Sequence, residues 1–481
     1  MNGLAFAGQE ETARSPSYGA EAFPATDGGP RVIVDLTDVL AQLADGQLLT
    51  GIPRVVLQFA NAAPALARRH GISLRFGYFD QVASHFVELQ ETDRGHPSPE
   101  AGSLQWLTGA DGVALANARM INFPKIHAKY AGKPIRRRLQ LAKGKLRLAH
   151  RRIIRNIRTN FTGGVRRRPL QFQPNDVFLM LGSGWNALPL LDYIRPFASS
   201  GLIRPVILVH DVIPLLDLGE PPPVPAAIFR QWLDQAAELT QDFLTYSVAT
   251  RNDLLKYFET SGRTSPNVEV VPLAHELTID RRTALSRPIR NLIRSRYSLF
   301  VGPTHGRKNA LRLLEAWRIV LSRLGPELTP ILAITDGASA SRIEATHIRP
   351  IESHVRLLDR PGDFELSVLY RRAAFTVFPS LYEGWGLPVG ESLWHGTPCI
   401  TSNLSAMPEV GGTLCDYVDP LSVESIAKAV QRLASDERYR NQRAQLIKGN
   451  KFRCWNGFAE GVLTFAARRQ QEQRHACSQR H

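Results

Sequence analysis

The chain has 481 residues, of which 43% are hydrophobic and 21% charged, a balance typical of globular proteins with sizeable cores. Its length exceeds what one core usually holds, so we expect two domains. Four widely spaced cysteines without a CxxC pair argue against a disulfide framework and a zinc site. The sequence has no apolar run long enough to span a membrane and no signal-peptide pattern, which predicts a cytoplasmic protein.

Residues 1–30 are rich in Gly, Ala, Pro and Ser, and predict a flexible tail. From there, apolar runs of strand length alternate with amphipathic segments of helix length, as in parallel sheets covered by helices. The first set of expected strands is 31–36, 73–79, 176–182, 205–211, 243–247 and 268–273. The second set is 298–302, 330–335, 354–359, 375–379, 398–402 and 414–418.

The segment 278–297 between the two sets is polar and basic, which places a domain boundary near residue 285. The predicted fold class is α/β, with two doubly wound, Rossmann-like parallel-sheet domains facing a cleft where ligands bind. The expected domains are residues 31–285 and 286–455, followed by a C-terminal helix and tail at 456–481.

The net charge of +15 comes from one segment of the first domain. Residues 112–175 contain 17 Lys and Arg and no Asp or Glu, which leaves 42 basic and 44 acidic residues elsewhere. Within this basic insert, residues 132–160 place six apolar side chains on one helical face with Arg and Lys around them. These are Leu139, Ala142, Leu146, Ala149, Ile153 and Ile157.

That pattern is typical of an interfacial helix on anionic lipid. The alternatives are a solvated basic helix packed on its own domain, and a site for nucleic acid or another polyanion. The scarcity of interleaved aromatic residues argues against nucleic acid.

A glycine-containing loop, "PSLYEGWGLPVGESLWHG", follows the expected strand 375–379 and leads into a helix. Gly384 and Gly386 would let the backbone approach a ligand, and the helix N-terminus would offer N–H groups to a phosphate. Glu391 is expected in the first turn of this helix and Glu383 before it. Because carboxylates repel phosphate, hydroxyl groups of a sugar or ribose suit them better. The alternative is a capping carboxylate and a solvated loop glutamate.

The segment "SLFVGPTHGRKNALRLLEAW" repeats the strand, loop and helix pattern, with Arg307, Lys308 and Asn309 at the helix start. Cations at a helix N-terminus oppose its dipole, so a bound anion explains them better than helix stability does. A diphosphate would satisfy both loops. Taken alone, this loop fits a solvated surface equally well.

The nine residues from Glu383 to Glu391 resemble the EX7E signature of the retaining glycosyltransferases of family 4, or glycosyltransferase group 1. "VGPTHGRKN" resembles the diphosphate loop of that family. Further matches, among them "TGIPRVV" and "HDVIPL", extend from about residue 32 to 460, and these two resemble its mannosyltransferase-like branch. The resemblance implies a GT-B fold and transfer of a hexose from a nucleotide sugar with retention, without a required metal or a tightly bound cofactor.

The resemblance also implies roles for individual residues. The catalytic candidates are Glu383 facing the donor sugar, His210 near the reacting sugar, and Lys308 and Arg307 on the diphosphate. Without the resemblance, His210 reads as a packed or capping histidine. The other donor-binding candidates are Gly302, Gly384, Trp385, Gly386, Leu387, the ribose-binding Glu391, and Leu357 beside the nucleobase. The remaining substrate-binding candidates are Gly51, Arg54 and Asp211.

The sequence thus predicts a transferase of polysaccharide biosynthesis that uses GDP-mannose as first candidate donor and a UDP-sugar as second. Its acceptor would be a glycan or lipid-linked glycan, and the protein would sit peripherally on the inner face of an anionic membrane. The alternative is a catalytically silent GT-B scaffold that binds a polyanion or membrane through the insert. Such a scaffold would lack the EX7E or diphosphate residues, which this chain has.

Overall fold

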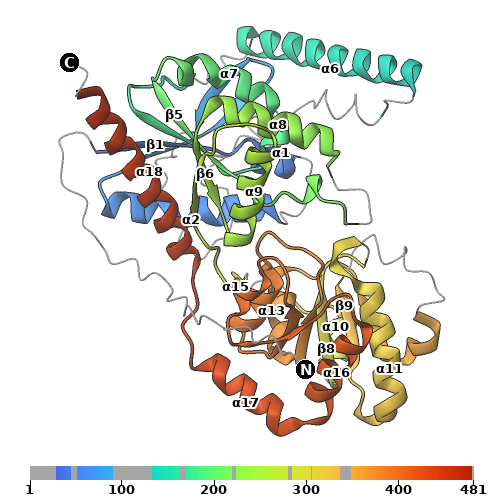
Figure 1. Ribbon diagram of the computed structural model, residues 1–481. Coiled ribbons are helices and arrows are strands. Elements are labelled where there is room, and N and C mark those ends of the chain that lie inside the picture. Colours follow the sequence, from blue (N-terminus) through green and yellow to red (C-terminus); the bar gives the residue numbers. More distant parts are fainter. Residues whose placement is uncertain are drawn as a thin grey trace, which may run out of the picture.

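The computed structural model describes residues 29–44, 51–89, 130, 133–161, 169–218, 224–279, 284–304, 306–335 and 348–478. Within them lie two separate sheets, each with helices on its faces (Figure 1). The fold class is the predicted one, two doubly wound α/β domains. The expected N-terminal tail and much of the basic insert lie outside the described residues.

The first sheet has the strand order β3-β2-β1-β4-β5-β6-β7. Its strands are β1 (Arg31–Asp35), β2 (Ser73–Asp80), β3 (His85–Leu89), β4 (Asp176–Met180), β5 (Ile203–Leu208), β6 (Asp242–Thr245) and β7 (Asn267–Val270). All neighbours pair in parallel except β3, which runs antiparallel to β2. The sequence did not predict β3, because its five residues HFVEL include a histidine and a glutamate and lack the continuous apolar run of a strand in a parallel sheet.

The second sheet has the order β10-β9-β8-β11-β12-β13 and is wholly parallel. Its strands are β8 (Tyr297–Val301), β9 (Ile331–Thr335), β10 (Val355–Leu358), β11 (Phe375–Phe378), β12 (Cys399–Ser402) and β13 (Cys415–Val418). Every strand overlaps the expected one. The central pair, β8 and β11, lies side by side, so the loops that follow both strands leave the same edge of the sheet.

Helices cover both sheets. The first domain has α1 (Thr37–Ala44), α2 (Ile52–Arg69), α6 (Pro134–Phe161), α7 (Leu188–Ser199), α8 (Ala226–Leu239) and α9 (Val248–Thr260). The second has α10 (Arg287–Leu292), α11 (Ala310–Leu328), α13 (Asp363–Arg372), α14 (Leu387–Trp394), α15 (Met407–Gly411), α16 (Val423–Ser435) and α17 (Glu437–Lys448). The boundary expected near residue 285 falls between the last strand of the first sheet and α10.

The last helix, α18 (Trp455–Ser478), leaves the second domain and packs against the first (Figure 1). Its Phe458 is fully buried and meets Phe59 of α2 edge to face, with ring centroids 6.2 Å apart. Further along, the Arg469 carbonyl accepts a hydrogen bond of 2.8 Å from Arg204. The C-terminal helix is therefore part of the core of the first domain.

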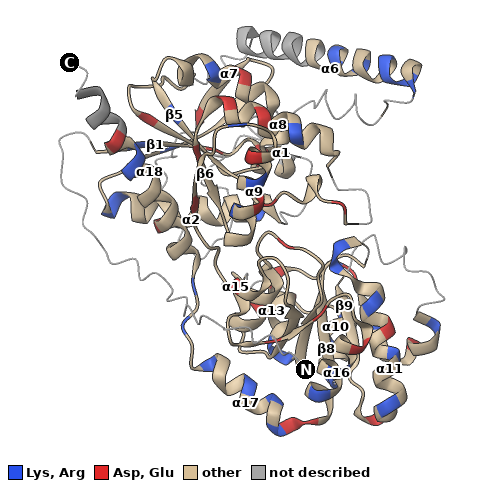
Figure 2. Ribbon diagram, viewed as in Figure 1, with Lys and Arg blue, Asp and Glu red and all other residues tan. Residues whose placement is uncertain are grey.

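The helix expected in the basic insert is present as α6, which extends beside the first domain (Figure 1). Lys and Arg mark its described part, whereas both signs of charge alternate over the helices of the second domain (Figure 2). In the part of the chain that the structure describes, no helix is long and apolar enough to cross a membrane.

We predict that Phe458→Ala destabilises the first domain by about 3 to 5 kcal/mol, because it removes a fully buried aromatic ring from a packed core. The measurement is the free energy of unfolding from a denaturant titration. Leu446→Ala is the matched control, since that side chain is 54% exposed and its loss should change stability by less than about 0.5 kcal/mol. Equal stability of the two variants would contradict the packing described for α18.

Candidate active site

The loop between β11 and α14 is shaped by Gly386, which caps the helix with a φ of 105°. A side chain is strained in that conformation, and a Cβ there would also lie 2.8 Å from the Met407 sulfur. The helix begins at Leu387, with Pro388 in its first turn. Glu391 therefore lies in the second turn. The expectation of a first-turn position was wrong, because the helix already begins at Leu387, four residues before Glu391.

Glu383 precedes the helix and is 5% exposed. Its Oε1 lies 2.6 Å from the Lys308 Nζ, and its Oε2 lies 3.3 Å from an Arg307 nitrogen. Burial alone would raise the pKa of Glu383, but the two cations outweigh it and hold this pKa below its usual value. Burial also lowers the pKa of Lys308, against the opposing effect of Glu383. The result is a buried carboxylate held by two cations from the neighbouring loop.

Asn309 joins the two loops that follow β8 and β11. It adopts a left-handed conformation with a φ of 65° at the N-cap of α11. Its side-chain nitrogen donates to the carbonyl of Pro379 at 2.9 Å and to that of Pro420 at 2.7 Å. Residues 306–308 form a 3₁₀ turn before the helix, so Arg307 and Lys308 precede α11 and reach across to Glu383.

Glu391 is 3% exposed and has a partner from each domain. Its Oε1 lies 3.1 Å from Nη1 of Arg54 on α2, and its Oε2 accepts a hydrogen bond of 2.9 Å from the Tyr370 hydroxyl on α13. Burial raises the pKa of Glu391, although Arg54 opposes this shift. The other guanidinium nitrogens of Arg54 are buried without a hydrogen-bond partner. Arg54 thus has two nitrogens beside the Glu391 carboxylate whose N–H groups can donate to another acceptor.

The first domain contributes His210 and Asp211 at the end of β5. His210 is 3% exposed, and its Nδ1 lies 2.7 Å from the Tyr246 hydroxyl. Burial lowers the pKa of His210 to about 4, so the ring is neutral at pH 7. Burial raises the pKa of Asp211 to about 6, with Arg307 opposing and Glu383 adding to the shift. Asp211 of the first domain therefore interacts electrostatically with Arg307 and Glu383 of the second domain.

The two domains touch at Gly384. A Cβ at this position would lie 2.2 Å from the His210 carbonyl oxygen, so only glycine allows this approach. The Gly384 carbonyl accepts a hydrogen bond of 2.8 Å from Ser247. In addition, the carboxylate of Glu409 accepts from the backbone N–H groups of Val248 and Ala249 at 2.7 and 2.8 Å, capping α9 from the other domain.

The structure brings most of the sequence-predicted residues to this junction of strand ends. Gly302 has a φ of 143° directly after β8, and the Lys308 side chain packs over it. Gly51 is the N-cap of α2, whose first three residues are Ile52, Pro53 and Arg54. Trp385 is 5% exposed and meets His275 edge to face, whereas Leu387 begins α14. Leu357 lies apart from the carboxylates on β10, where it is 40% exposed.

Sequence reasoning missed Tyr246, Ser247, Tyr370 and Glu409 as site neighbours. Tyr246 and Ser247 are the last two residues of the expected strand 243–247 and directly follow β6 in the structure, so their place at a strand end was a signal available for them. Tyr370 and Glu409 lie on helices and meet the site only through tertiary packing.

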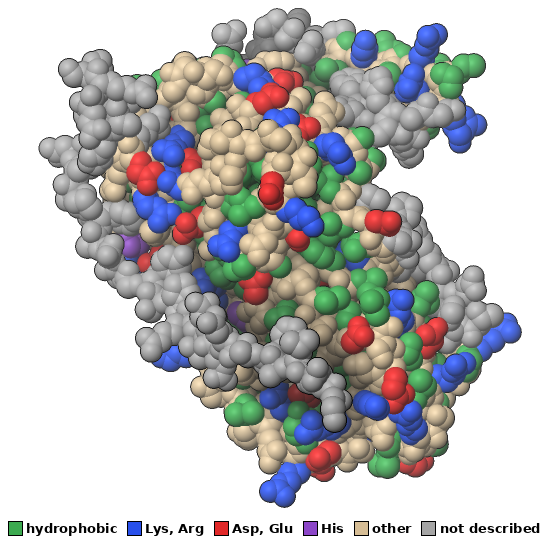
Figure 3. Space-filling view, in the orientation of Figure 1, with side chains coloured by type: hydrophobic (Ala, Val, Ile, Leu, Met, Phe, Trp, Pro, Cys, Tyr) green, Lys and Arg blue, Asp and Glu red, His purple; other side chains and the backbone are tan. Residues whose placement is uncertain are grey.

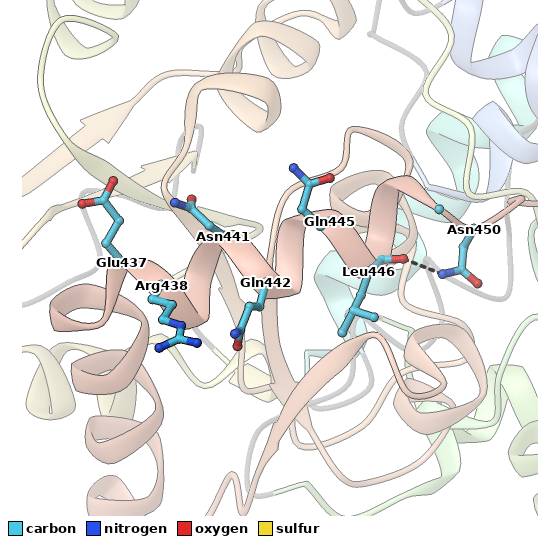
Figure 4. Close-up of a pocket in the computed structure, with 8 residues that line it drawn as sticks. Glu437, Arg438, Asn441, Gln442, Gln445, Leu446 and Asn450 are labelled. Carbon is cyan, nitrogen blue, oxygen red and sulfur yellow. Dashed lines mark hydrogen bonds between the residues drawn. The ribbon is translucent and has the colours of Figure 1, made fainter.

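Two further features lie outside this junction. A surface pocket of about 1210 Å³ lies along α17 and is lined by side chains of that helix, among them Asn441, Gln442 and Gln445 (Figure 4). Among the described residues, no group of three or more His, Cys, Asp or Glu is arranged to hold a metal ion.

Comparison with known proteins finds a family model that matches part of the chain. The model of the family "Glycosyl transferases group 1" matches residues 295–436. The O-antigen chain mannosyltransferase B of Escherichia coli is 25% identical over 57% of this chain and 74% of its own length. The MMP alpha-(1->4)-mannosyltransferase of Mycolicibacterium hassiacum is 27% identical over 44% of this chain, which spans about half (49%) of that relative.

A sucrose-phosphate synthase from Thermosynechococcus elongatus has a similar fold, with a TM-score of 0.51 and 15% identity. The similarity covers 94% of this chain and all of that one. It extends over both sheets, so the two domains together have the GT-B arrangement. The second domain of this chain, from residue 295 to 436, therefore belongs to the glycosyl transferases group 1 family.

Proposed function

We propose that the protein is a retaining hexosyltransferase that takes a sugar from a nucleoside diphosphate sugar. The observation that supports this most directly is the cluster at Glu383. Lys308 and Arg307 bring two positive charges to one buried carboxylate. Together with Asp211 the cluster has two carboxylates for its two cations. A phosphate that replaces one of these contacts would find both cations and the helix N–H groups at the N-terminus of α14.

Departure of a nucleoside diphosphate leaves negative charge on its phosphate. The cations are held by Glu383 on a loop that Asn309 fixes. They need little reorganisation when that charge develops, so they stabilise the transition state more than the ground state. Retention of configuration suits an attack on the same face of the sugar, in which the leaving phosphate accepts the proton of the acceptor hydroxyl. Glu383 would then face the donor sugar.

Glu391 suits the ribose hydroxyls of the donor. In the structure its two oxygens contact Arg54 and Tyr370. A ribose could replace the Arg54 contact, because Arg54 has further nitrogens that can turn to a nearby phosphate. The donor would in this way exchange one ion pair between the domains for two contacts of its own. Leu357 would flank the nucleobase from β10.

The names of the sequence relatives support mannose as the transferred sugar. We propose GDP-mannose as first candidate donor, with a UDP-sugar second. The name of the E. coli relative supports a glycan acceptor in polysaccharide synthesis, and we propose a glycan or lipid-linked glycan. We propose that the protein acts in the cytoplasm, peripherally on the inner face of the membrane. No metal is assigned to the reaction.

Glu383→Ala should lower sugar transfer at least 100-fold, because it removes the carboxylate that faces the donor sugar and orients Lys308. Glu383→Gln keeps the side-chain shape and should show a similar loss with a smaller change in stability. The measurement is product formation from radiolabelled GDP-mannose, with folding checked by thermal unfolding. Glu424→Ala, on the exposed face of α16, is the control and should keep full activity. Unchanged turnover in both Glu383 variants would refute the assignment.

Nucleoside diphosphates should raise the thermal unfolding midpoint, because a ligand that binds only the folded state stabilises it by about 2.7 kcal/mol at 100 times its dissociation constant. We expect GDP to act at lower concentration than UDP. Lys308→Ala should abolish the shift, whereas Lys428→Ala, on a side chain that is 73% exposed, should leave it intact. A native protein unaffected by any nucleoside diphosphate would contradict the proposed donor site.

Acid should destabilise the protein through His210. Its folded pKa of about 4 lies below the unfolded value of 6.5, so the unfolded state binds more protons between these values. Stability is therefore complete above pH 6.5 and is lost as the pH falls toward 4, by about 3 kcal/mol for this group. His210→Gln should show a shallower loss of unfolding free energy over that range. An unchanged slope would mean that His210 does not stay neutral in the fold.

A further inference from the structure

Helix α6 presents an apolar stripe to solvent. Ile135, Leu139 and Leu146 are 76%, 56% and 69% exposed, and Ala142 and Ala149 between and after them are also exposed. Their spacing of four and three residues keeps all five on one side of the helix. A soluble surface rarely shows three large aliphatic side chains in one line, so this stripe suits an apolar partner.

Cations lie on both sides of this stripe. At about 100° per residue, Arg136, Lys143 and Arg147 fall on one flank, and Arg138 and Lys145 fall on the other. All five are exposed, and residues 133–149 contain no acidic residue. Blue and green side chains project together from the end of α6 at the upper right of the molecule (Figure 3). The free face of the helix is therefore apolar along its centre and positive along both edges.

The opposite face of the helix behaves differently. Arg137, Leu141 and Leu148 are partly buried and Gly144 is buried, so this face is turned toward the protein. The exposed stripe thus points away from the domain to which α6 belongs. A solvated basic helix packed on its own domain would bury its apolar stripe there, whereas this stripe is exposed in the described residues 133–149.

We propose that this face of α6 docks on an anionic phospholipid bilayer. The leucines would enter the boundary between headgroups and acyl chains, while the flanking cations contact lipid phosphates. An exposed aliphatic stripe does not contribute to nucleic-acid binding, and residues 133–149 contain no aromatic ring for base stacking. A second copy of the chain would set seven Lys and Arg of residues 133–149 against seven others, which repels.

Docking of α6 on a membrane does not depend on the proposed sugar transfer. The benefit of docking to the enzyme does rest on that proposed function. If the acceptor is a lipid-linked glycan, a helix on the first domain would hold the acceptor side of the enzyme at the surface where that substrate resides. Such anchoring raises the local acceptor concentration without any change at Glu383 or Lys308.

The test is sedimentation of the full chain with vesicles of phosphatidylcholine alone or with phosphatidylglycerol added. We expect binding only to the anionic vesicles, and weaker binding at 0.5 M than at about 0.1 M salt, since salt screens the cations. Leu139→Ser with Leu146→Ser should weaken binding more than tenfold, because two leucines no longer bury apolar surface. Leu421→Ser with Leu446→Ser is the matched control, with leucines 62% and 54% exposed on the second domain, and should bind as the native chain does.

A second pair of variants tests the charges. Replacing Arg138, Lys143 and Arg147 by Ser should weaken binding about 100-fold, at about fivefold for each basic residue near the surface. The same replacement of Arg318, Lys428 and Arg438, exposed on the second domain, should change it little. Every variant should keep the native unfolding midpoint and its shift with GDP, so a failed donor assignment would not be mistaken for failed docking.

Three results would overturn the proposal: no binding to anionic vesicles, equal binding to neutral ones, or native binding by the Leu139 and Leu146 double variant. Binding of RNA or DNA that is lost with the same substitutions, in the absence of vesicle binding, would assign the helix to nucleic acid instead.

Discussion

The ion pair between Lys308 and Glu383 is the constraint on which the arrangement of the site depends. A carboxylate that is 5% exposed is costly unless a cation compensates it, and here both side chains come from loops at the ends of neighbouring parallel strands. The pair needs β8 and β11 adjacent, and it needs the two loops joined by Asn309. Removing either condition leaves a charge buried without its partner.

A buried carboxylate is also compensated by a cation across the domain boundary. Glu391 is compensated by Arg54 of the other domain, and Gly384 lets the loop after β11 reach the His210 carbonyl. The protein thus compensates the buried carboxylates Glu383 and Glu391 with its own cations. A diphosphate sugar that enters must compete with these contacts, which links donor binding to the way the two domains hold together.

Much of the fold could be predicted from the sequence because the strands of a doubly wound sheet are continuous apolar runs. All six strands of the second sheet and six of the seven in the first were expected from largely apolar runs, whereas the antiparallel β3 was not. The loops carrying Glu383 and Lys308 could be found because glycine, proline and charge mark a strand-to-helix turn. Tyr370 and Glu409 could not, because their contacts arise from helix packing and leave no trace in local spacing. The return of α18 to the first domain was hidden for the same reason.

The most direct test of the account is a crystal structure of the protein with GDP bound. The account requires the diphosphate to contact Lys308 and Arg307 near the N-terminus of α14, and the ribose hydroxyls to contact Glu391 with Arg54 displaced from it. A nucleotide bound elsewhere, or one that leaves the ion pairs of Glu383 and Glu391 as they are in the free protein, would contradict it.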